Sequence, residues 1–383
     1  MGHRHPRTRK PRGRSRVGER FEAEVGPVAH GGHCVVRLPE PESRVVFVRH
    51  AIPGERVVLE VTEGTDGDRF WRADAVEVLA ASPDRVVPPC PFAGPGLCGG
   101  CDFQHVRLGR QRELKADVVR EQLSRLAGLD VAVTVEGVPG DVPEVELGLR
   151  WRTRQQYVHL ADGGIGMRRH RSRDVIRIDD CRIAHPDARE PAPGTVVEEV
   201  DGRRFEVAAD GFWQVHPGAP QTLVGAVLDA LRPQPGETCL DLYAGVGLFS
   251  RFLADAVGES GRVVAVEGDR QASALSALNV STADVRAGDV GEVLATAYDD
   301  PFDLVVLDPP REGARRPVVE QVVARRPRAV AYVACDPAAL ARDVGIFAEH
   351  GYLLRSLRAL DLFPMTHHVE CVALLEKTDP DLR

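Results

Sequence analysis

The fold is decided by residues 238–249, TCLDLYAGVGLF, which predict a strand, a glycine-rich turn and the start of a helix. Gly245 and Gly247 let a ligand approach the backbone closely, and the helix start offers free N–H groups. A single G-x-G sequence is a weak signal on its own. Its interpretation therefore depends on the segments that follow it.

Each of the next predicted strands is followed by an acidic residue. Residues 262–266 lead into Glu267, at a distance from the turn where an acid accepts hydrogen bonds from ribose hydroxyls. Asp289 follows a short third strand, where its carboxylate would face an adenine edge, and residues 302–307 lead into Asp308. Ligands bind at the carboxyl ends of strands in open α/β sheets, so these residues predict a nucleoside pocket.

Two cofactors, NAD and S-adenosylmethionine, would fit this arrangement of strands and acids. The dinucleotide fingerprint needs a third glycine after G-x-G, and position 250 is Ser250. No pyrophosphate cradle is evident, which favours S-adenosylmethionine.

A cysteine lies at the end of another β-rich run, residues 329–333. Cys335 follows this run, and Pro337 prevents the strand from continuing. At the carboxyl end of a strand the thiol would point into the ligand crevice, which indicates a catalytic role. A buried structural cysteine is the alternative and is the commoner fate of a lone cysteine.

Composition limits the class of protein. The 383 residues suffice for two or three domains, and the net charge of −8 argues against a uniformly basic nucleic-acid binder but allows local basic patches. No apolar run is long enough to span a membrane. Residues 1–16 hold seven Arg or Lys and no acid, so we expect a disordered basic arm, with weak phosphate contact as the alternative. Eight cysteines without a signal peptide indicate metal binding or catalysis in a reducing cytosol, and we expect a cytoplasmic monomer.

The N-terminal part predicts a small β-barrel followed by a cysteine-rich loop. Short Val-rich runs between residues 17 and 79 are separated by Gly, Pro and Asp turns. Three thiols then occur within twelve residues, and a fourth lies far away: Cys90, Cys98, Cys101 and Cys181. Structural zinc sites usually show paired knuckles of similar spacing, so the asymmetry favours an iron–sulfur cluster over zinc.

The middle of the chain predicts one helix and an Arg-rich sheet. Residues 108–126 show apolar side chains at helical spacing, and Gly128 follows as a stop. Residues 150–157 and 167–173 predict a hairpin rich in Arg and aromatic residues, which suits RNA contact better than a solvated charged face. The Pro- and Glu-rich residues 189–200 predict a loop or linker.

Together these motifs resemble the bacterial RNA uridine-5 methyltransferase family, which carries an N-terminal TRAM domain. The resemblance covers residues 17–376, and residues 46–55 resemble the TRAM signature. The motifs that carry the resemblance are the four cysteines above, FWQVH (212–216), DLYAGVG (241–247), DPPREG (308–313), YVACDP (332–337), and Phe363-Pro364 with His368-Val369-Glu370.

The resemblance implies a role for each matching residue. Cys335 corresponds to the family's nucleophile and Glu370 to the base that removes the C5 proton; Val369 and Val372 are expected to lift the pKa of Glu370. The four cysteines match ligands of a 4Fe–4S cluster. Contacts to S-adenosylmethionine are implied for Gln214, Tyr243, Gly245, Glu267, Asp289 and Asp308.

Four positions depart from the family pattern. His216 and Asp336 stand where Asn is common, Ala244 where Cys is common, and Met365 where His or Gln is frequent. The added negative charge of Asp336 is expected to raise the pKa of the Cys335 thiol.

The sequence thus predicts a Rossmann-like α/β methyltransferase that modifies a uridine in loop or single-stranded RNA, either rRNA or tRNA. Methylation of cytosine C5 and a non-catalytic RNA-binding or assembly factor are the alternatives. Arg311 is expected to contact a phosphate. The predicted parts are a basic arm (1–16), a TRAM barrel (17–80), an iron–sulfur loop (81–105), a linker helix with a β-rich RNA-contacting domain (106–235) and the methyltransferase domain (236–383).

Overall fold

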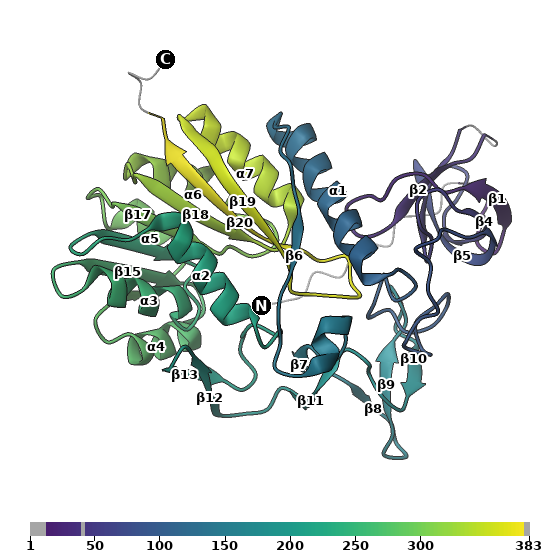
Figure 1. Ribbon diagram of the computed structural model, residues 1–383, viewed down its shortest axis with the longest axis horizontal. Helices are drawn as coiled ribbons and strands as arrows, with labels where there is room; N and C mark the ends of the chain where they lie inside the picture. Colours follow the sequence, from purple (N-terminus) through teal and green to yellow (C-terminus); the bar gives the residue numbers. More distant parts are fainter. Residues whose placement is uncertain (1–12, 40–42, 379–383) are drawn as a thin grey trace.

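A computed structural model describes residues 13–39 and 43–378. Figure 1 shows an N-terminal β-domain beside helix α1, a β-rich central part, and a large α/β domain that ends the chain. Most of the predicted basic arm, residues 1–12, lies outside the described residues. Within the remainder, the Arg16 amide donates to the Gly64 carbonyl, and Ser15 pairs with Thr65, so residues 15 and 16 lie against the N-terminal domain.

The N-terminal domain is a curled five-stranded sheet with the order β1-β4-β5-β3-β2. Its strands alternate buried and exposed residues, which is the pattern of a sheet with one face on a core. The core is built around Trp71, whose indole N–H donates to the Thr65 carbonyl at 2.9 Å. The strands are β1 (Arg20–Glu24), β2 (Cys34–Arg37), β3 (Val45–Arg49), β4 (Arg56–Glu63) and β5 (Phe70–Ala80).

Helix α1 (Leu108–Ala127) follows the cysteine-rich loop and confirms the predicted helix. It ends at Gly128, whose φ of 66° is the left-handed conformation of a helix C-cap. Lys115 of α1 is fully buried and donates to Asp361 at 2.6 Å and to the Phe363 carbonyl at 3.0 Å. This buried ion pair ties α1 to the α/β domain.

The central part contains small sheets, and two predictions about it are wrong. Residues 150–157 were expected to pair with residues 167–173 in a hairpin around residues 162–164. Instead, this hairpin is formed by β8 and β9, and β7 pairs in parallel with β11, which follows the hairpin in the chain. Residues 189–200 contain strand rather than only loop, since β12 pairs with β13 over its whole length. The elements are β6 (Val135–Gly137), a 3₁₀ turn (Pro143–Leu147), β7 (Arg152–Arg154), β8 (Val158–His159), β9 (Ile165–Arg168), β10 (Val175–Ile178), β11 (Ala184–Arg189), β12 (Thr195–Val200) and β13 (Arg203–Ala208).

The α/β domain is an eight-stranded sheet with the order β16-β15-β14-β17-β18-β20-β19-β6. Pairings from β16 to β18 are parallel, and β20 runs antiparallel to both its neighbours. The strands are β14 (Thr238–Leu242), β15 (Arg262–Glu267), β16 (Asp284–Ala287), β17 (Leu304–Leu307), β18 (Ala329–Ala334), β19 (Tyr352–Asp361) and β20 (Glu370–Lys377). The helices are α2 (Ala219–Leu231), α3 (Leu248–Val257), α4 (Arg270–Asn279), α5 (Val290–Thr296), α6 (Arg315–Ala324) and α7 (Pro337–Glu349).

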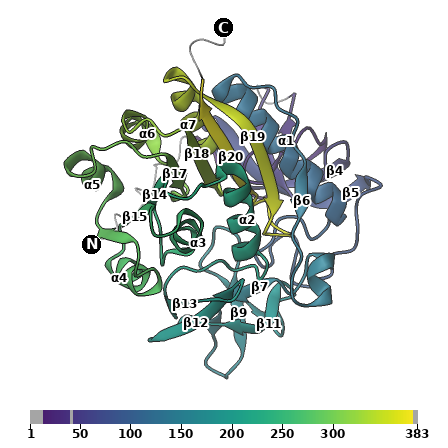
Figure 2. The same ribbon diagram turned by 60° about the vertical axis from the view of Figure 1, so that its left-hand side comes forward.

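Helices cover both faces of this sheet, as Figure 2 shows. One core packs α1, α5, α6 and α7 against one face, and the other packs α2 and α3 against the opposite face. The central strands are buried throughout, as expected for parallel strands covered on both sides. The predicted Rossmann-like fold is therefore confirmed.

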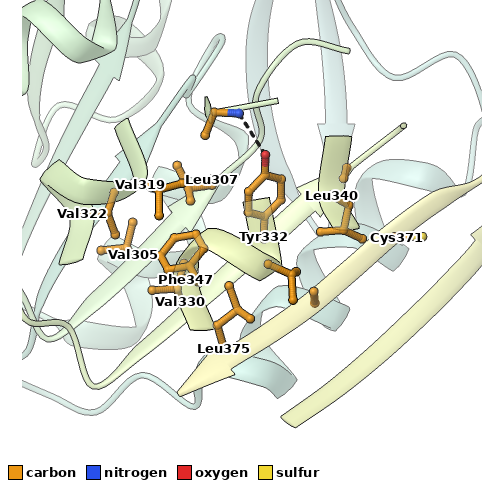
Figure 3. Close-up of a cluster of buried hydrophobic side chains, with 14 of the residues drawn as sticks. Val305, Leu307, Val319, Val322, Val330, Tyr332, Leu340, Phe347, Cys371 and Leu375 are labelled. Carbon is orange, nitrogen blue, oxygen red and sulfur yellow. Dashed lines mark hydrogen bonds between the residues drawn. The ribbon is translucent and has the colours of Figure 1, made fainter. Parts of the chain in front are cut away.

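Tyr332 anchors the end of strand β18, which directly precedes the candidate nucleophile Cys335. Its ring lies among aliphatic side chains of β17, β20, α6 and α7 (Figure 3). The hydroxyl accepts from the Ala314 amide at 3.0 Å and donates to Asp343 at 2.7 Å. Because the buried hydroxyl is fully engaged, the end of β18 is held in a fixed position.

Candidate active site

Three neighbouring parallel strands end level with one another. In register, Leu242 of β14 lies between residues 266 of β15 and 307 of β17. Tyr243, Glu267 and Asp308 therefore come together at the carboxyl edge of the sheet, and Asp289 follows the adjacent strand β16. The sequence prediction that these polar residues share one edge is confirmed as geometry.

The glycine-rich turn is braced by Glu267. Its carboxylate accepts from the Gly245 amide at 2.8 Å and from the Asp269 amide at 2.6 Å. Tyr243 has a φ of 64°, a conformation that is uncommon for a residue with a side chain. Backbone strain of this kind gathers at ligand sites, where the surroundings enforce it.

Buried carboxylates make this edge acidic. Asp241 is fully buried and accepts from the Ser250 hydroxyl at 2.5 Å, and burial raises its pKa to about 6. Burial, with the charges of Asp241 and Glu267, raises the pKa of Asp308 to about 7. Asp289 caps α5 by accepting from the Glu292 amide at 3.0 Å. A set of desolvated acids favours a cationic ligand, because a positive charge relieves their mutual repulsion.

Cys335 and Glu370 lie at the adjoining ends of two paired strands. Ala334 of β18 is the partner of Cys371 in β20, and Cys335 and Glu370 are the residues directly beyond this last pair, close enough for the charge of Glu370 to act on the thiol. Glu370 is 5% exposed, and burial and the charge of Asp308 raise its pKa well above the ordinary value. The direction agrees with the expected effect of apolar neighbours, and Asp308 is an additional cause that the sequence did not indicate.

The Cys335 thiol is half-buried, and several carboxylates disfavour its charged form. Burial comes first, and Glu370 and Asp308 follow, in raising the pKa of Cys335 to about 11. Asp336 also raises this pKa, as the sequence predicted, but it is the weakest contributor, and Arg311 acts in the opposite direction.

Cys335 lines a pocket with a volume of about 90 Å³ that is formed by several parts of the chain. Arg311 follows β17, Lys115 comes from α1, and His367 comes from the loop before β20. His30 comes from the N-terminal domain, between β1 and β2, and sequence reasoning missed it. No local pattern marks this histidine, because its role depends on contact with a distant domain.

The loop before β20 is fixed by the cysteine-rich loop. The amides of Asp102 and Phe103 both donate to the Met365 carbonyl, at 2.9 and 3.0 Å. The Asp102 carboxylate pairs with His367 Nδ1 at 2.6 Å. Arg311 donates to the neighbouring ring of His368 at 2.8 Å. The cysteine-rich loop thus supports the segment that leads directly into Glu370.

The four predicted metal-ligating cysteines line a single pocket with a volume of about 270 Å³. Gln104 donates to Cys101 Sγ at 3.5 Å, and Gln155 donates to Cys181 Sγ at 3.0 Å. Among residues 13–39 and 43–378, no group of three or more His, Cys, Asp or Glu is arranged to hold a metal ion. The four cysteines therefore lie around one pocket, but their thiols are not arranged as the ligands of a single metal ion.

Two further predicted positions lie between β13 and α2. Gln214 is half-buried there, and the His216 ring is buried, stacks on Trp151 at 6.2 Å between centroids and accepts from the Gly218 amide at 3.2 Å. Burial lowers the pKa of His216 to about 4, so the ring is neutral at physiological pH. His216 therefore acts as a packed, uncharged residue in the segment between β13 and α2.

The arginines of the central part have two different roles. Arg150 pairs with Asp180 at 2.6 Å, and Arg154 donates to the Ala209 carbonyl at 3.2 Å, so both brace the fold. Arg168 and Arg173, on or beside the β9–β10 hairpin, are exposed. The predicted Arg-rich surface is therefore confined to this hairpin.

A curled N-terminal β-domain joined to a sheet that is covered by helices on both faces and carries polar residues at its carboxyl edge defines a TRAM-domain methyltransferase. The chain matches the TRAM domain over residues 14–76, the methyltransferase small domain over 224–330 and the tRNA (uracil-5-)-methyltransferase family over 292–378. None of the described helices is long and apolar enough to cross a membrane.

Similar proteins extend over almost the whole chain. An RNA methyltransferase of Streptomyces avermitilis is 46% identical and covers 94% of this chain and 99% of its own. The 23S rRNA (uracil(1939)-C(5))-methyltransferase RlmD of Alkalilimnicola ehrlichii is 30% identical and covers 95% and 98%. The crystal structure of Pyrococcus abyssi tRNA (uracil-54, C5)-methyltransferase with S-adenosyl-L-homocysteine shares the fold, with 21% identity, a TM-score of 0.69 and coverage of 93% and 100%. The chain belongs to the S-adenosylmethionine-dependent RNA uracil-5 methyltransferase family.

Proposed function

We propose that this protein transfers a methyl group from S-adenosylmethionine to C5 of a uridine in RNA, with Cys335 as nucleophile and Glu370 as base. The observation that supports this most directly is that the paired strands β18 and β20 place Cys335 and Glu370 at adjoining ends, beside the acidic edge of the sheet. A thiol and a buried carboxylate on one wall are the two groups that this reaction needs from the protein.

The two side chains act in sequence on the pyrimidine. The Cys335 thiolate adds to C6, and the electron pair of the C5–C6 bond moves so that C5 becomes nucleophilic. S-adenosylmethionine would supply the electrophilic methyl group that C5 attacks, with the methyl–sulfur bond breaking and S-adenosylhomocysteine leaving. Glu370 then removes the C5 proton, the double bond re-forms, and the C6–sulfur bond breaks to release Cys335.

The raised pKa values of Cys335, Glu370 and Asp308 limit the number of negative charges that the site carries at one time. Glu370 and Asp308 raise the pKa of Cys335, and Asp308 raises the pKa of Glu370, so the unliganded site retains protons. A sulfonium cation bound beside these carboxylates favours their ionised forms. Glu370 therefore becomes a competent base in the same complex in which the methyl group is present.

The remaining acids fit a nucleoside ligand. Glu267 would accept from ribose hydroxyls, Asp289 would face the adenine, and Asp308 would hold the cofactor amine or the uracil. Gln214, Tyr243 and Gly245 would complete the cofactor site. This assignment is supported by the shared strand edge and the braced glycine-rich turn.

The RNA substrate would present an unstacked uridine, from a loop or a single strand of rRNA or tRNA, because a stacked base cannot enter a pocket beside Cys335. The exposed arginines of the β9–β10 hairpin and the TRAM domain would contact its backbone. Arg311, in the pocket itself, would contact a phosphate.

The four cysteines would hold a 4Fe–4S cluster. Support comes from the chemistry of the donor set, four thiols on one roomy pocket, which suits iron and sulfide. Cys90, Cys98, Cys101 and Cys181 would be the ligands, and the cluster would brace the loop that fixes Met365. Iron and acid-labile sulfide, measured in protein purified without oxygen, should be present and should be lost in Cys181→Ser but retained in Cys239→Ser, whose thiol lies in a separate core.

The reaction is tested by incubating the protein with RNA and S-adenosylmethionine labelled in the methyl group. Nucleoside analysis should give labelled 5-methyluridine, and Cys335→Ala should give none. Labelled 5-methylcytidine would assign the reaction to cytosine. The absence of transfer to any RNA, despite tight cofactor binding, would favour a non-catalytic RNA-binding factor and refute the proposal.

A further inference from the structure

The N-terminal domain lines the catalytic pocket with residues 30–32 and forms an ion pair there. His30 Nε2 lies 3.1 Å from Asp336 Oδ2, although the two residues are 306 positions apart in the chain. His30 belongs to the loop between β1 and β2, and both residues line the pocket that contains Cys335. The contact therefore joins the TRAM domain to the residue that directly follows the nucleophile.

The loop that carries His30 approaches the pocket closely. Gly32 has a φ of 77°, and a Cβ atom at this position would lie 2.5 Å from the His367 Cβ atom. A side chain is therefore excluded there by both conformation and space. The backbone shape that presents His30 to Asp336 depends on this glycine.

The two carboxylate oxygens of Asp336 have separate partners. Oδ1 accepts from the amides of Ala338 and Ala339, at 3.0 and 2.9 Å, and caps α7. Oδ2 faces His30. An asparagine would retain an oxygen for the cap and would lose only the negative charge, so the two roles can be separated by mutation.

We propose that His30 is a positioning residue of the catalytic site: by pairing with Asp336 it holds the TRAM domain against the nucleophile and offsets the negative charge next to Cys335. This inference rests on the proposed role of Cys335. Through Asp336 the histidine acts on the thiol without touching the substrate.

Other charged groups face the same atoms and set the background. Arg311 and Glu121 of α1 act on His30 together with Asp336. Glu370, Asp308 and Arg311 act on Cys335. These groups are unchanged when His30 is replaced, so the difference between variant and wild type reports the pair alone.

The pair has a specific pH signature. The contact with Asp336 raises the pKa of His30, so the ring is charged below that value and neutral above it. A charged His30 stabilises the neighbouring thiolate, and its loss of the proton removes this effect. Between about pH 6 and 9, the logarithm of the Cys335 alkylation rate should therefore rise with a slope below one in the wild type. In His30→Asn the slope should be closer to one, and the remaining deviation comes from Asp308, whose pKa of about 7 lies in the same range and whose charge also acts on Cys335.

The experiment measures alkylation of full-length protein by iodoacetamide, followed by mass spectrometry of the tryptic peptide 329–342, which contains Cys335 as its single cysteine. At about pH 6, His30→Asn should react about three- to tenfold more slowly than wild type, and the ratio should approach one near pH 9. In an Asp336→Asn background the His30 substitution should have no effect. The matched control is His159→Asn, which removes an exposed histidine–carboxylate pair of 3.0 Å in the central part and should change nothing.

Equal rates for His30→Asn and wild type at every pH would overturn the inference, and so would an undiminished effect in the Asp336→Asn background. The assay contains neither RNA nor cofactor. If His30 affects the alkylation of Cys335 but no methyl transfer occurs, the proposed reaction is refuted. If methyl transfer is normal but His30 has no effect on alkylation, only the role of His30 is refuted.

Discussion

Replacing Asp308 by asparagine should stabilise the protein at pH 8 while abolishing methyl transfer. The pKa of Asp308 is raised from 3.8 to about 7, so the folded state binds this proton more tightly than the unfolded state. Stability is therefore lost as the pH rises from about 4 to 7. Three pKa units correspond to at most about 4 kcal/mol, and partial exposure of the carboxyl reduces this to about 2 kcal/mol. Asparagine cannot ionise and avoids the loss.

The assay is urea unfolding of wild type and Asp308→Asn at pH 5 and pH 8. The variant should gain about 2 kcal/mol over wild type at pH 8, and clearly less at pH 5, where Asp308 is protonated in the folded protein. Asp299→Asn is the control, because its side chain is 98% exposed. If the variant is less stable than wild type at pH 8, or if its unfolding free energy depends on pH as that of wild type does, burial does not raise the pKa of Asp308 as described.

Two further substitutions test other parts of the structure. Glu370→Gln should lower turnover about 10²- to 10⁴-fold and accumulate a covalent RNA complex, because the thiol leaves only after C5 is deprotonated; gel electrophoresis under denaturing conditions checks this, and a full loss of the complex would contradict it. Lys115→Met should cost about 3 kcal/mol in urea unfolding, because it leaves Asp361 buried with Arg112 alone at 3.1 Å. An unchanged midpoint would show that Arg112 suffices.

The sequence predicted the methyltransferase sheet because its signals are local. Each strand runs directly into its polar residue, as at Glu267 and Asp308, and the parallel register then brings those residues to one edge. Cys335 and Glu370 follow the same logic, since each lies at a strand end. Order along the chain was enough to predict that these residues share one edge of the sheet, without knowledge of the pairing.

What the sequence did not predict depends on distant partners. The hairpin was assigned to residues 150–157, but Arg152–Arg154 pairs with β11, and no composition signal distinguishes a parallel partner thirty or so residues away from an adjacent one. Residues 189–200 contain prolines and acids typical of loops, yet Thr195–Val200 gains a strand by pairing with β13. His30 is a third case, because its function arises only where two domains meet.

RNA that contains 5-fluorouridine tests whether Cys335 forms a covalent bond to the uracil ring during methyl transfer. Fluorine at C5 cannot be removed as a proton, so the methylated adduct should remain covalently attached to the protein. With S-adenosylmethionine present, mass spectrometry should find the nucleotide on Cys335 in the peptide 329–342. Cys335→Ser should form no adduct. An adduct formed by Cys335→Ser, or attached to another residue in the wild type, would contradict the account.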